Sequence, residues 1–324
     1  MLNIIWNKKS IKDEFGEKGA QKLKNAFNSV KGEIFDTTPD LVSEIVANSK
    51  KDSSFLIIGG DHLFPFYKAE NPTRDGDDII WTDNFYASTD DDPLLPERPI
   101  GRLPDGGDLD FLIEKIHSIH YPENDEIRRD ETFGLSAAVW VESSRNVYRV
   151  ISKRKLLASP PESTHSIGID GRTDMFYFNL HGSDKTNKWY GQGNGKYPIA
   201  LAPENIPELG KAIVFTEACY GAYTIQKSIS DSIALTFLKR GVRYFVGSTT
   251  IAYGPPVPPP TEADLIGALF FKEIVKGEKV GNALLNAKVK FFKEMIDKQG
   301  FLDGNDRKTL LQFVLYGNPE GRLI

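Results

Sequence analysis

The sequence predicts an α/β fold with a largely parallel central sheet flanked by helices. Short apolar runs, each long enough for a buried strand, alternate along the chain with amphipathic stretches of helical periodicity. The length of 324 residues accommodates two domains or one large α/β unit. With 40% hydrophobic and 26% charged residues, the composition is that of an ordinary folded protein.

The expected strands are the apolar runs at 54–60, 132–141, 175–182, 212–219, 243–249 and 312–318. Helical periodicity is found at 10–30, 40–49, 108–120, 146–157, 226–240, 262–276 and 280–298. Strands that alternate with helices usually run parallel, because each crossover returns the chain to the same edge of the sheet. The polar, charged stretch at 120–131 predicts a linker between a smaller α/β subdomain, 1–125, and a second domain, 126–324.

Charge and hydropathy exclude several classes of partner. The net charge is −5 and no dense block of lysine or arginine occurs, so we expect neither nucleic acid nor an anionic membrane as a partner. No apolar run approaches the roughly 18 residues of a membrane span, and the first residues lack the apolar core of a secretory signal. We therefore expect a cytoplasmic protein, or a secreted one if a signal had been removed. The single cysteine also favours a reducing compartment.

Reactive or polar residues follow four of the expected strands. In an open parallel sheet, ligands bind beyond the carboxyl ends of the strands. The motifs at these ends are Gly60-Asp61-His62, His181-Gly182, Glu217-Ala218-Cys219 and Gly247-Ser248-Thr249. The last three follow successive strands of the second domain, so we expect them to share one cleft.

Cys219 and His181 together predict acyl-transfer chemistry. A thiolate is a strong nucleophile, and we expect a helix to begin just after Cys219 and to stabilise its negative charge. His181 would transfer the proton, while the backbone N–H groups of Gly182 and Cys219 would hold an oxyanion. A lone cysteine or histidine is more often a packing residue, and the order of the two motifs is what favours catalysis. Zinc is not expected, because the cysteine has no second thiolate partner.

These motifs resemble those of a known peptidase group. "FYFNLHG" followed by "AIVFTEACYGA" is similar to the catalytic blocks of the caspase-like cysteine peptidases, which include caspases, legumain, clostripain, separase and the gingipains. "FLIIGGDHLFPF" and the segment at 82–104, which contains "IGRLP", resemble the front half of the gingipain-type catalytic unit. "LQFVLYGNPEGRLI" resembles its closing segment, except that Asn318 stands where aspartate is more frequent. The resemblance covers about residues 50–324.

The resemblance implies a caspase-like sandwich preceded by a smaller α/β subdomain. It also implies a cysteine endopeptidase that acts on a polypeptide substrate through a thioester, with Cys219 as the nucleophile and His181 as the proton donor. Gly182 and Cys219 would supply the oxyanion hole. Neither a metal nor a cofactor is required for this chemistry.

Substrate preference is open at the level of sequence. In clostripain-like and metacaspase relatives, an acidic residue at the position of Glu217 lines a pocket for a basic side chain. Legumain-like enzymes prefer asparagine and also carry Glu-Ala-Cys. Ser248 and Thr249 are expected to offer backbone groups to an extended peptide, and Tyr253 a flat apolar surface. Glu217 could equally face a helix N-terminus, and Tyr253 could simply cover the core.

Two acidic clusters and one histidine have alternative interpretations. Calcium prefers carboxylate ligands, but the spacing of the aspartates does not match a calcium loop, and acidic runs are usually solvated. The two clusters are Asp75, Asp77 and Asp78, and Asp90, Asp91 and Asp92. The pair Asp61-His62 lacks a nearby nucleophile, so turn capping is expected there.

Three rival hypotheses remain beside a gingipain-like endopeptidase. One is a peptidase of the related CHAT class, and another is a legumain-like peptidase. The third is a catalytically inactive peptide-binding domain of the same fold. The natural substrate and the oligomeric state are not predicted.

Overall fold

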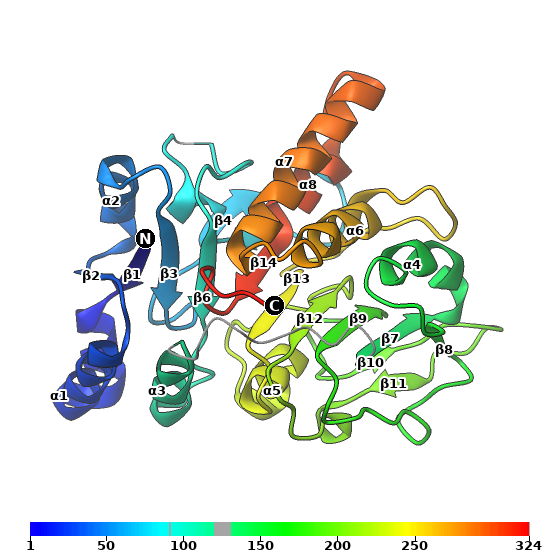
Figure 1. The fold of residues 1–324 in the computed structure, drawn as a ribbon, viewed down its shortest axis with the longest axis horizontal. Coiled ribbons are helices and arrows are strands. Elements are labelled where there is room, and N and C mark those ends of the chain that lie inside the picture. The colour runs from blue at the N-terminus through cyan, green and yellow to red at the C-terminus, as the bar shows by residue number, and fades with distance from the viewer. Residues whose placement is uncertain (91, 120–130, 324) are drawn as a thin grey trace.

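A single sheet of ten strands runs through the whole molecule (Figure 1). The computed structural model describes residues 1–90, 92–119 and 131–323. Within these ranges the strand order is β2-β1-β3-β6-β14-β13-β12-β9-β7-β8. All neighbouring pairs are parallel except β13 and β14, which are antiparallel. The predicted α/β class with a largely parallel sheet is confirmed.

The bounds of the elements are as follows. The strands of the large sheet are β1 Leu2–Trp6, β2 Glu33–Asp36, β3 Ser54–Ile58, β6 Ile100–Leu103, β7 Thr132–Ala137, β8 Leu157–Ser159, β9 Met175–Asn179, β12 Ile213–Thr216, β13 Tyr244–Ser248 and β14 Phe313–Tyr316. Two hairpins are formed by β4 Tyr67–Glu70 with β5 Ile79–Thr82, and by β10 Trp189–Tyr190 with β11 Ile199–Leu201. The α-helices are α1 Lys8–Ala26, α2 Val42–Asn48, α3 Leu109–Ser118, α4 Val141–Tyr148, α5 Ile233–Lys239, α6 Glu262–Ile274, α7 Val280–Gln299 and α8 Gly304–Gln312.

Helices cover both faces of the sheet. Helices α1, α3 and α5 lie on one face, and α2, α4, α6, α7 and α8 lie on the other (Figure 1). Because successive residues of a strand point to opposite faces, Met175 and Tyr177 of β9 join one core cluster while Phe176 and Phe178 join another. A strand buried on both faces needs apolar residues throughout, which explains the continuous apolar runs in the sequence.

The C-terminal strand β14 joins the two halves of the sheet. It lies between β6 of the N-terminal half and β13 of the C-terminal half. Strands on both sides of the expected boundary therefore belong to one sheet, and the division at residue 125 stays a prediction. Apart from Glu131, the expected linker at 120–131 lies outside the described residues.

Several elements differ from the sequence prediction. The helix expected at 146–157 lies earlier, as α4, so the run 132–141 is a strand only as far as Ala137. Strands β1, β2, β6 and β8 were not predicted, because each is only three to five residues long and shows no alternation of its own. Helix α8 was also missed, because it merges directly into β14.

Arg102 gives the "IGRLP" segment a structural role. It is fully buried on β6 and donates two hydrogen bonds to the carboxylate of Asp83, at 3.0 and 2.5 Å. It also donates to the carbonyl oxygens of Gly59 and Phe64. A bidentate arginine–carboxylate pair fixes both partners, so Arg102 ties the end of β3 to the segment after β5.

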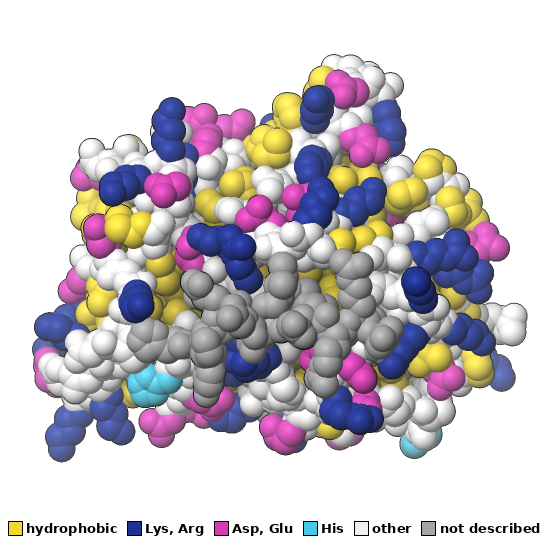
Figure 2. All heavy atoms as spheres, viewed as in Figure 1, with side chains coloured by type: hydrophobic (Ala, Val, Ile, Leu, Met, Phe, Trp, Pro, Cys, Tyr) yellow, Lys and Arg dark blue, Asp and Glu magenta, His cyan; other side chains and the backbone are white. Residues whose placement is uncertain are grey.

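The surface and the helices bear on the expectation about membranes. On the face shown in Figure 2, basic and acidic side chains are interspersed. Among the described helices, none has the length and apolar character that crossing a membrane requires.

Candidate active site

The sheet register places His181 beside Cys219. Strands β9 and β12 are parallel neighbours, with Phe178 opposite Thr216, and the Glu217 amide continues the pairing by donating to the Phe178 carbonyl at 2.8 Å. His181 and Cys219 each lie three residues beyond this pair, at the carboxyl edge of the sheet. Adjacent strands are about 4.8 Å apart, so the two side chains start from neighbouring positions. The two motifs therefore lie at the same edge of the sheet, and the cleft that they were expected to share stays a prediction.

Gly182 packs directly against the Cys219 backbone. A Cβ atom at position 182 would overlap the Cys219 carbonyl oxygen, so only glycine fits there. Neither the Gly182 nor the Cys219 N–H donates a hydrogen bond within the part of the chain that the structure describes. Both residues are partly exposed, so an N–H group at either position can donate to water or to a ligand oxygen.

His181 is held at both its backbone and its ring. Its backbone exchanges two hydrogen bonds with Tyr190, at 2.9 and 2.8 Å. The ring nitrogen Nε2 lies 2.7 Å from Oε1 of Gln192. The ring also packs on Trp140, with centroids 4.4 Å apart, and on Tyr197, with centroids 5.6 Å apart. These contacts fix the orientation of the His181 ring.

Cys219 lies in a tight turn, which corrects one expectation. Gly221 donates to the Ala218 carbonyl to close the turn, and Tyr220 adopts a left-handed φ of 55°. No helix begins at Cys219, because the Ala222 amide pairs with the Ser248 carbonyl instead. The expected stabilisation of a thiolate by a helix N-terminus is therefore wrong. Burial raises the pKa of the Cys219 thiol, and the thiol contacts the Ala252 carbonyl at 3.6 Å.

Glu217 forms a buried acid pair with Asp264 of α6. Glu217 is 5% exposed and Asp264 is 0% exposed. Tyr177 donates to Oε1 of Glu217 at 2.8 Å, whereas Oε2 of Glu217 and both carboxylate oxygens of Asp264 accept no hydrogen bond from any other residue that the structure describes. Burial and then repulsion by Asp264 raise the pKa of Glu217 well above its ordinary range. Burial is also the main cause that raises the pKa of Asp264 to about 7.

One exposed glycine covers this acid pair. A Cβ atom on Gly254 would lie 2.7 Å from Oδ2 of Asp264 and 4.0 Å from Oε2 of Glu217. Gly254 is itself exposed, and it lies two residues after Ala252, which contacts the thiol. Two extended residues span at most about 7 Å, so the thiol and the acid pair flank one short segment.

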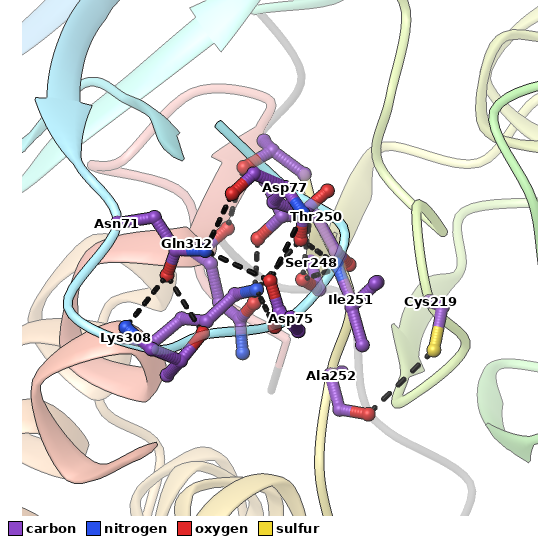
Figure 3. Close-up of polar contacts among 12 residues, drawn as sticks. Asn71, Asp75, Asp77, Cys219, Ser248, Thr250, Ile251, Ala252, Lys308 and Gln312 are labelled. Carbon is purple, nitrogen blue, oxygen red and sulfur yellow. Dashed lines mark hydrogen bonds and ion pairs between the residues drawn. The ribbon is translucent and has the colours of Figure 1, made fainter. Parts of the chain in front are cut away.

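A second acid pair has its own cation. Lys308 of α8 is fully buried and forms ion pairs with Asp75 and, at 2.6 Å, with Asp77 (Figure 3). Asp77 also accepts from the Tyr220 hydroxyl at 2.5 Å and from the Ile251 amide at 2.9 Å. The loop between β4 and β5 is thereby tied to the residues on either side of the thiol contact, Tyr220 and Ile251.

Tyr253 contacts the same ion pairs between Lys308 and the two aspartates. Its hydroxyl donates to Oδ2 of Asp75 at 2.6 Å, and Lys308 lies over its ring. Asp75 and Asp77, two of the aspartates considered as calcium ligands, therefore face an ammonium group. In the described ranges, no group of three or more His, Cys, Asp or Glu side chains could hold a metal ion, and Asp91 lies outside these ranges.

Ser248 and Thr249 lie beneath the surface. Both are at most 1% exposed, and Thr249 donates to the carbonyl oxygens of Trp81 and Gln312. The Ser248 carbonyl accepts from Ala222. Ser248 thereby holds the turn after Cys219, and the role of Ser248 and Thr249 in substrate binding stays a prediction.

Asp61 and His62 are apart from this site. Asp61 accepts from the Phe66 amide at 2.9 Å, which is the capping contact that the sequence suggested. His62 lies 3.4 Å from Asp105, which also accepts from the amides of Gly60 and Gly107. The pair therefore organises the loops after β3 and β6.

Sequence reasoning missed three residues of this region. Asp264 lies within an apolar helical run, Gln192 in a loop without periodicity, and Lys308 in the helix that was not predicted. An acidic residue inside the apolar run "ADLIGALFF" was the one available signal.

Comparison with known proteins identifies the fold. Neither a family model nor a curated protein sequence matches the chain. Gingipain R, described as an Arg-specific cysteine proteinase, is similar in structure, with a TM-score of 0.66 and 14% identity over 98% of this chain and 77% of that chain. The complex of the pro- and mature domains of gingipain R from Porphyromonas gingivalis gives a TM-score of 0.67, again at 14% identity, over 98% and 78%. A structure described only as a protease gives 0.64 at 12% identity. The chain therefore has the gingipain-type, caspase-like fold.

Proposed function

We propose that this protein is a cysteine endopeptidase with Cys219 as its nucleophile and His181 as its proton carrier. One observation carries the proposal: adjacent strand ends bring His181-Gly182 next to Cys219, and no hydrogen bond from the N–H of Gly182 or Cys219 to another described residue is present. This arrangement combines a nucleophile, a base and an oxyanion hole. The fold of a cysteine proteinase is consistent with it.

The reaction would proceed in two steps. Sγ of Cys219 bonds to the carbonyl carbon while its proton passes to His181, and the N–H groups of Gly182 and Cys219 bind the developing oxyanion. The tetrahedral adduct then collapses to a thioester as the C–N bond breaks, and His181 gives its proton to the leaving amine. Water attacks the thioester, releases the carboxylic acid and restores the thiol.

The buried acid pair supports a preference for basic residues. Three of the four carboxylate oxygens of Glu217 and Asp264 are buried without a hydrogen bond from the described residues, and in the described chain no lysine or arginine forms an ion pair with either group. Such a pair is costly unless a cation arrives, and a guanidinium can bind two carboxylates through its forked donors. An Arg or Lys side chain preceding the cleaved bond would pass Gly254 and supply that charge.

Fluorogenic peptides with Arg, Lys, Asn or Asp before the cleaved bond would test this function. The wild type should cleave the Arg and Lys peptides under reducing conditions, and Cys219→Ala should cleave none. Preference for Asn would instead support the legumain-like hypothesis. Absence of cleavage together with an unreactive thiol would support the inactive peptide-binding domain.

A further inference from the structure

Gln192 holds the catalytic histidine through a neutral side chain. Its Oε1 lies 2.7 Å from Nε2 of His181, and its Nε2 donates to the Tyr197 hydroxyl at 2.8 Å. The amide nitrogen is thus turned toward the tyrosine, and the carbonyl oxygen faces the imidazole. A carbonyl oxygen can only accept, so the proton between Gln192 and His181 belongs to the histidine.

The backbone of Gln192 is fixed as firmly as its side chain. The amide donates to the Ser159 carbonyl at 3.0 Å, and the carbonyl accepts from the Val139 amide at 3.1 Å. Ser159 ends β8 and Val139 follows β7, so Gln192 is anchored to two strand ends of the sheet. Gly191 packs so closely on Ser159 that a side chain there would overlap it. The position of the Gln192 backbone, from which the side-chain carbonyl reaches His181, is therefore set by the fold.

No charged group in the described part of the chain takes the place of Gln192 as the partner of His181. Among the described residues, no carboxylate forms an ion pair with His181, although His62 forms one with Asp105. The ring packs on Trp140 and Tyr197, which are neutral. Titratable groups on the surrounding elements are Cys219 after β12, Asp184 and Lys185 after Gly182, Lys188, Tyr190, Lys196 and Tyr197 on either side of Gln192, and Glu142 and Arg145 on α4.

We propose that Gln192 is the positioning residue of the site: it keeps the His181 proton on Nε2, so that Nδ1 takes the thiol proton and returns it to the leaving amine. This inference rests on the proposed function. Because Gln192 carries no charge, it orients the imidazole without electrostatically favouring the imidazolium. The resting pair is then a thiol and a neutral imidazole, and the proton moves only as Sγ bonds to the substrate carbon. The Cys219 thiol, whose pKa is raised by partial removal from solvent, fits this resting state.

The tautomer of His181 can be read directly from long-range proton–nitrogen NMR spectra of the imidazole. The His181 signals would be identified by their loss in His181→Ala. We expect the wild type to carry its proton on Nε2 and Gln192→Met, which lacks the carbonyl, to populate both tautomers. A proton on Nδ1 in the wild type, or an unchanged spectrum in Gln192→Met, would overturn the proposal.

Kinetics supply the second readout. Gln192→Met should lower kcat about 10- to 100-fold, with KM changed less than about twofold, because the lost contact orients a proton carrier. Gln192→Glu should keep His181 charged to higher pH than in the wild type and speed alkylation of Cys219 at mildly acidic pH. Gln21→Met, which removes an exposed contact to Asn25 on α1, is the matched control. Wild-type kcat and alkylation profiles in both Gln192 variants would contradict the assignment.

The two proposals fail separately. If the wild type cleaves no peptide, the proposed function is wrong, and the NMR result still decides whether Gln192 sets the tautomer. If cleavage occurs and the tautomer does not depend on Gln192, only the positioning role is lost.

Discussion

Two acid pairs flank the nucleophile, and among the described residues only one of these pairs has a cation. Asp75 and Asp77 enclose Lys308, whereas Glu217 and Asp264 have unpartnered carboxylate oxygens. A buried charge needs a counter-charge or a proton. The first pair obtains its counter-charge from the chain and becomes a structural clamp. The second obtains none, which is what a site for a basic side chain requires.

Lys308→Met should give the largest change in stability. It leaves Asp75 and Asp77, whose side chains are only 11% and 6% exposed, without a cation, so the free energy of unfolding should fall by about 3–5 kcal/mol. Lys298→Met removes an exposed i,i+4 pair with Glu294 and should cost less than about 0.5 kcal/mol. Urea denaturation of the two variants measures both values. Equal losses would show that Lys308 does not act as a clamp.

Substitutions in the other pair should change activity and leave stability intact. Glu217→Gln and Asp264→Asn should each lower kcat/KM for arginyl substrates by about 100-fold or more, because each removes a charge that pairs with the guanidinium. Their free energies of unfolding should equal or exceed that of the wild type, since an unpaired buried acid is gone. Loss of stability with unchanged kcat/KM would reverse the roles assigned to the two pairs.

The two pairs should respond to pH with opposite signs. The pKa of Asp264 is raised to about 7. The stability that its protonated form contributes to the fold is therefore present below its ordinary pKa of about 4 and is lost as pH rises through about 7. Burial alone would raise the pKa of Asp75, but hydrogen bonds from Lys308 and Tyr253 outweigh it and lower that pKa. The stability that ionised Asp75 contributes to the fold is therefore present above about pH 4 and is lost at lower pH.

Urea titrations across this range would separate the two effects. Asp264→Asn should flatten the decline in stability between about pH 4 and pH 7. Asp75→Asn should instead reduce the acid-sensitive part below about pH 4 and lower stability at neutral pH. If stability depended on pH in the same way in both variants, the different roles assigned to the Asp75–Asp77 pair and the Glu217–Asp264 pair would be contradicted.

The sequence alone indicated only one member of the acid pair Glu217–Asp264. Glu217 was found because it precedes Cys219 by two residues on a recognisable strand, whereas Asp264 and Lys308 reach the region through long-range packing of α6 and α8. The fold class followed from apolar runs that are buried on both faces. The shortest strands and the turn at Tyr220 depend on pairing with distant residues such as Ser248 and Thr250, which local patterns do not encode.

Labelling of Cys219 by matched peptidyl electrophiles tests the central claim most directly. One electrophile would carry arginine before the reactive group and the other citrulline, which has a similar shape without the charge. We predict that intact-mass measurement shows the arginyl probe on Cys219 at least about 100-fold faster than the citrullyl probe, with no adduct in Cys219→Ala. Glu217→Gln should erase most of this difference. Equal rates for both probes, or an unlabelled Cys219, would contradict an acid pair that guides basic residues to a catalytic thiol.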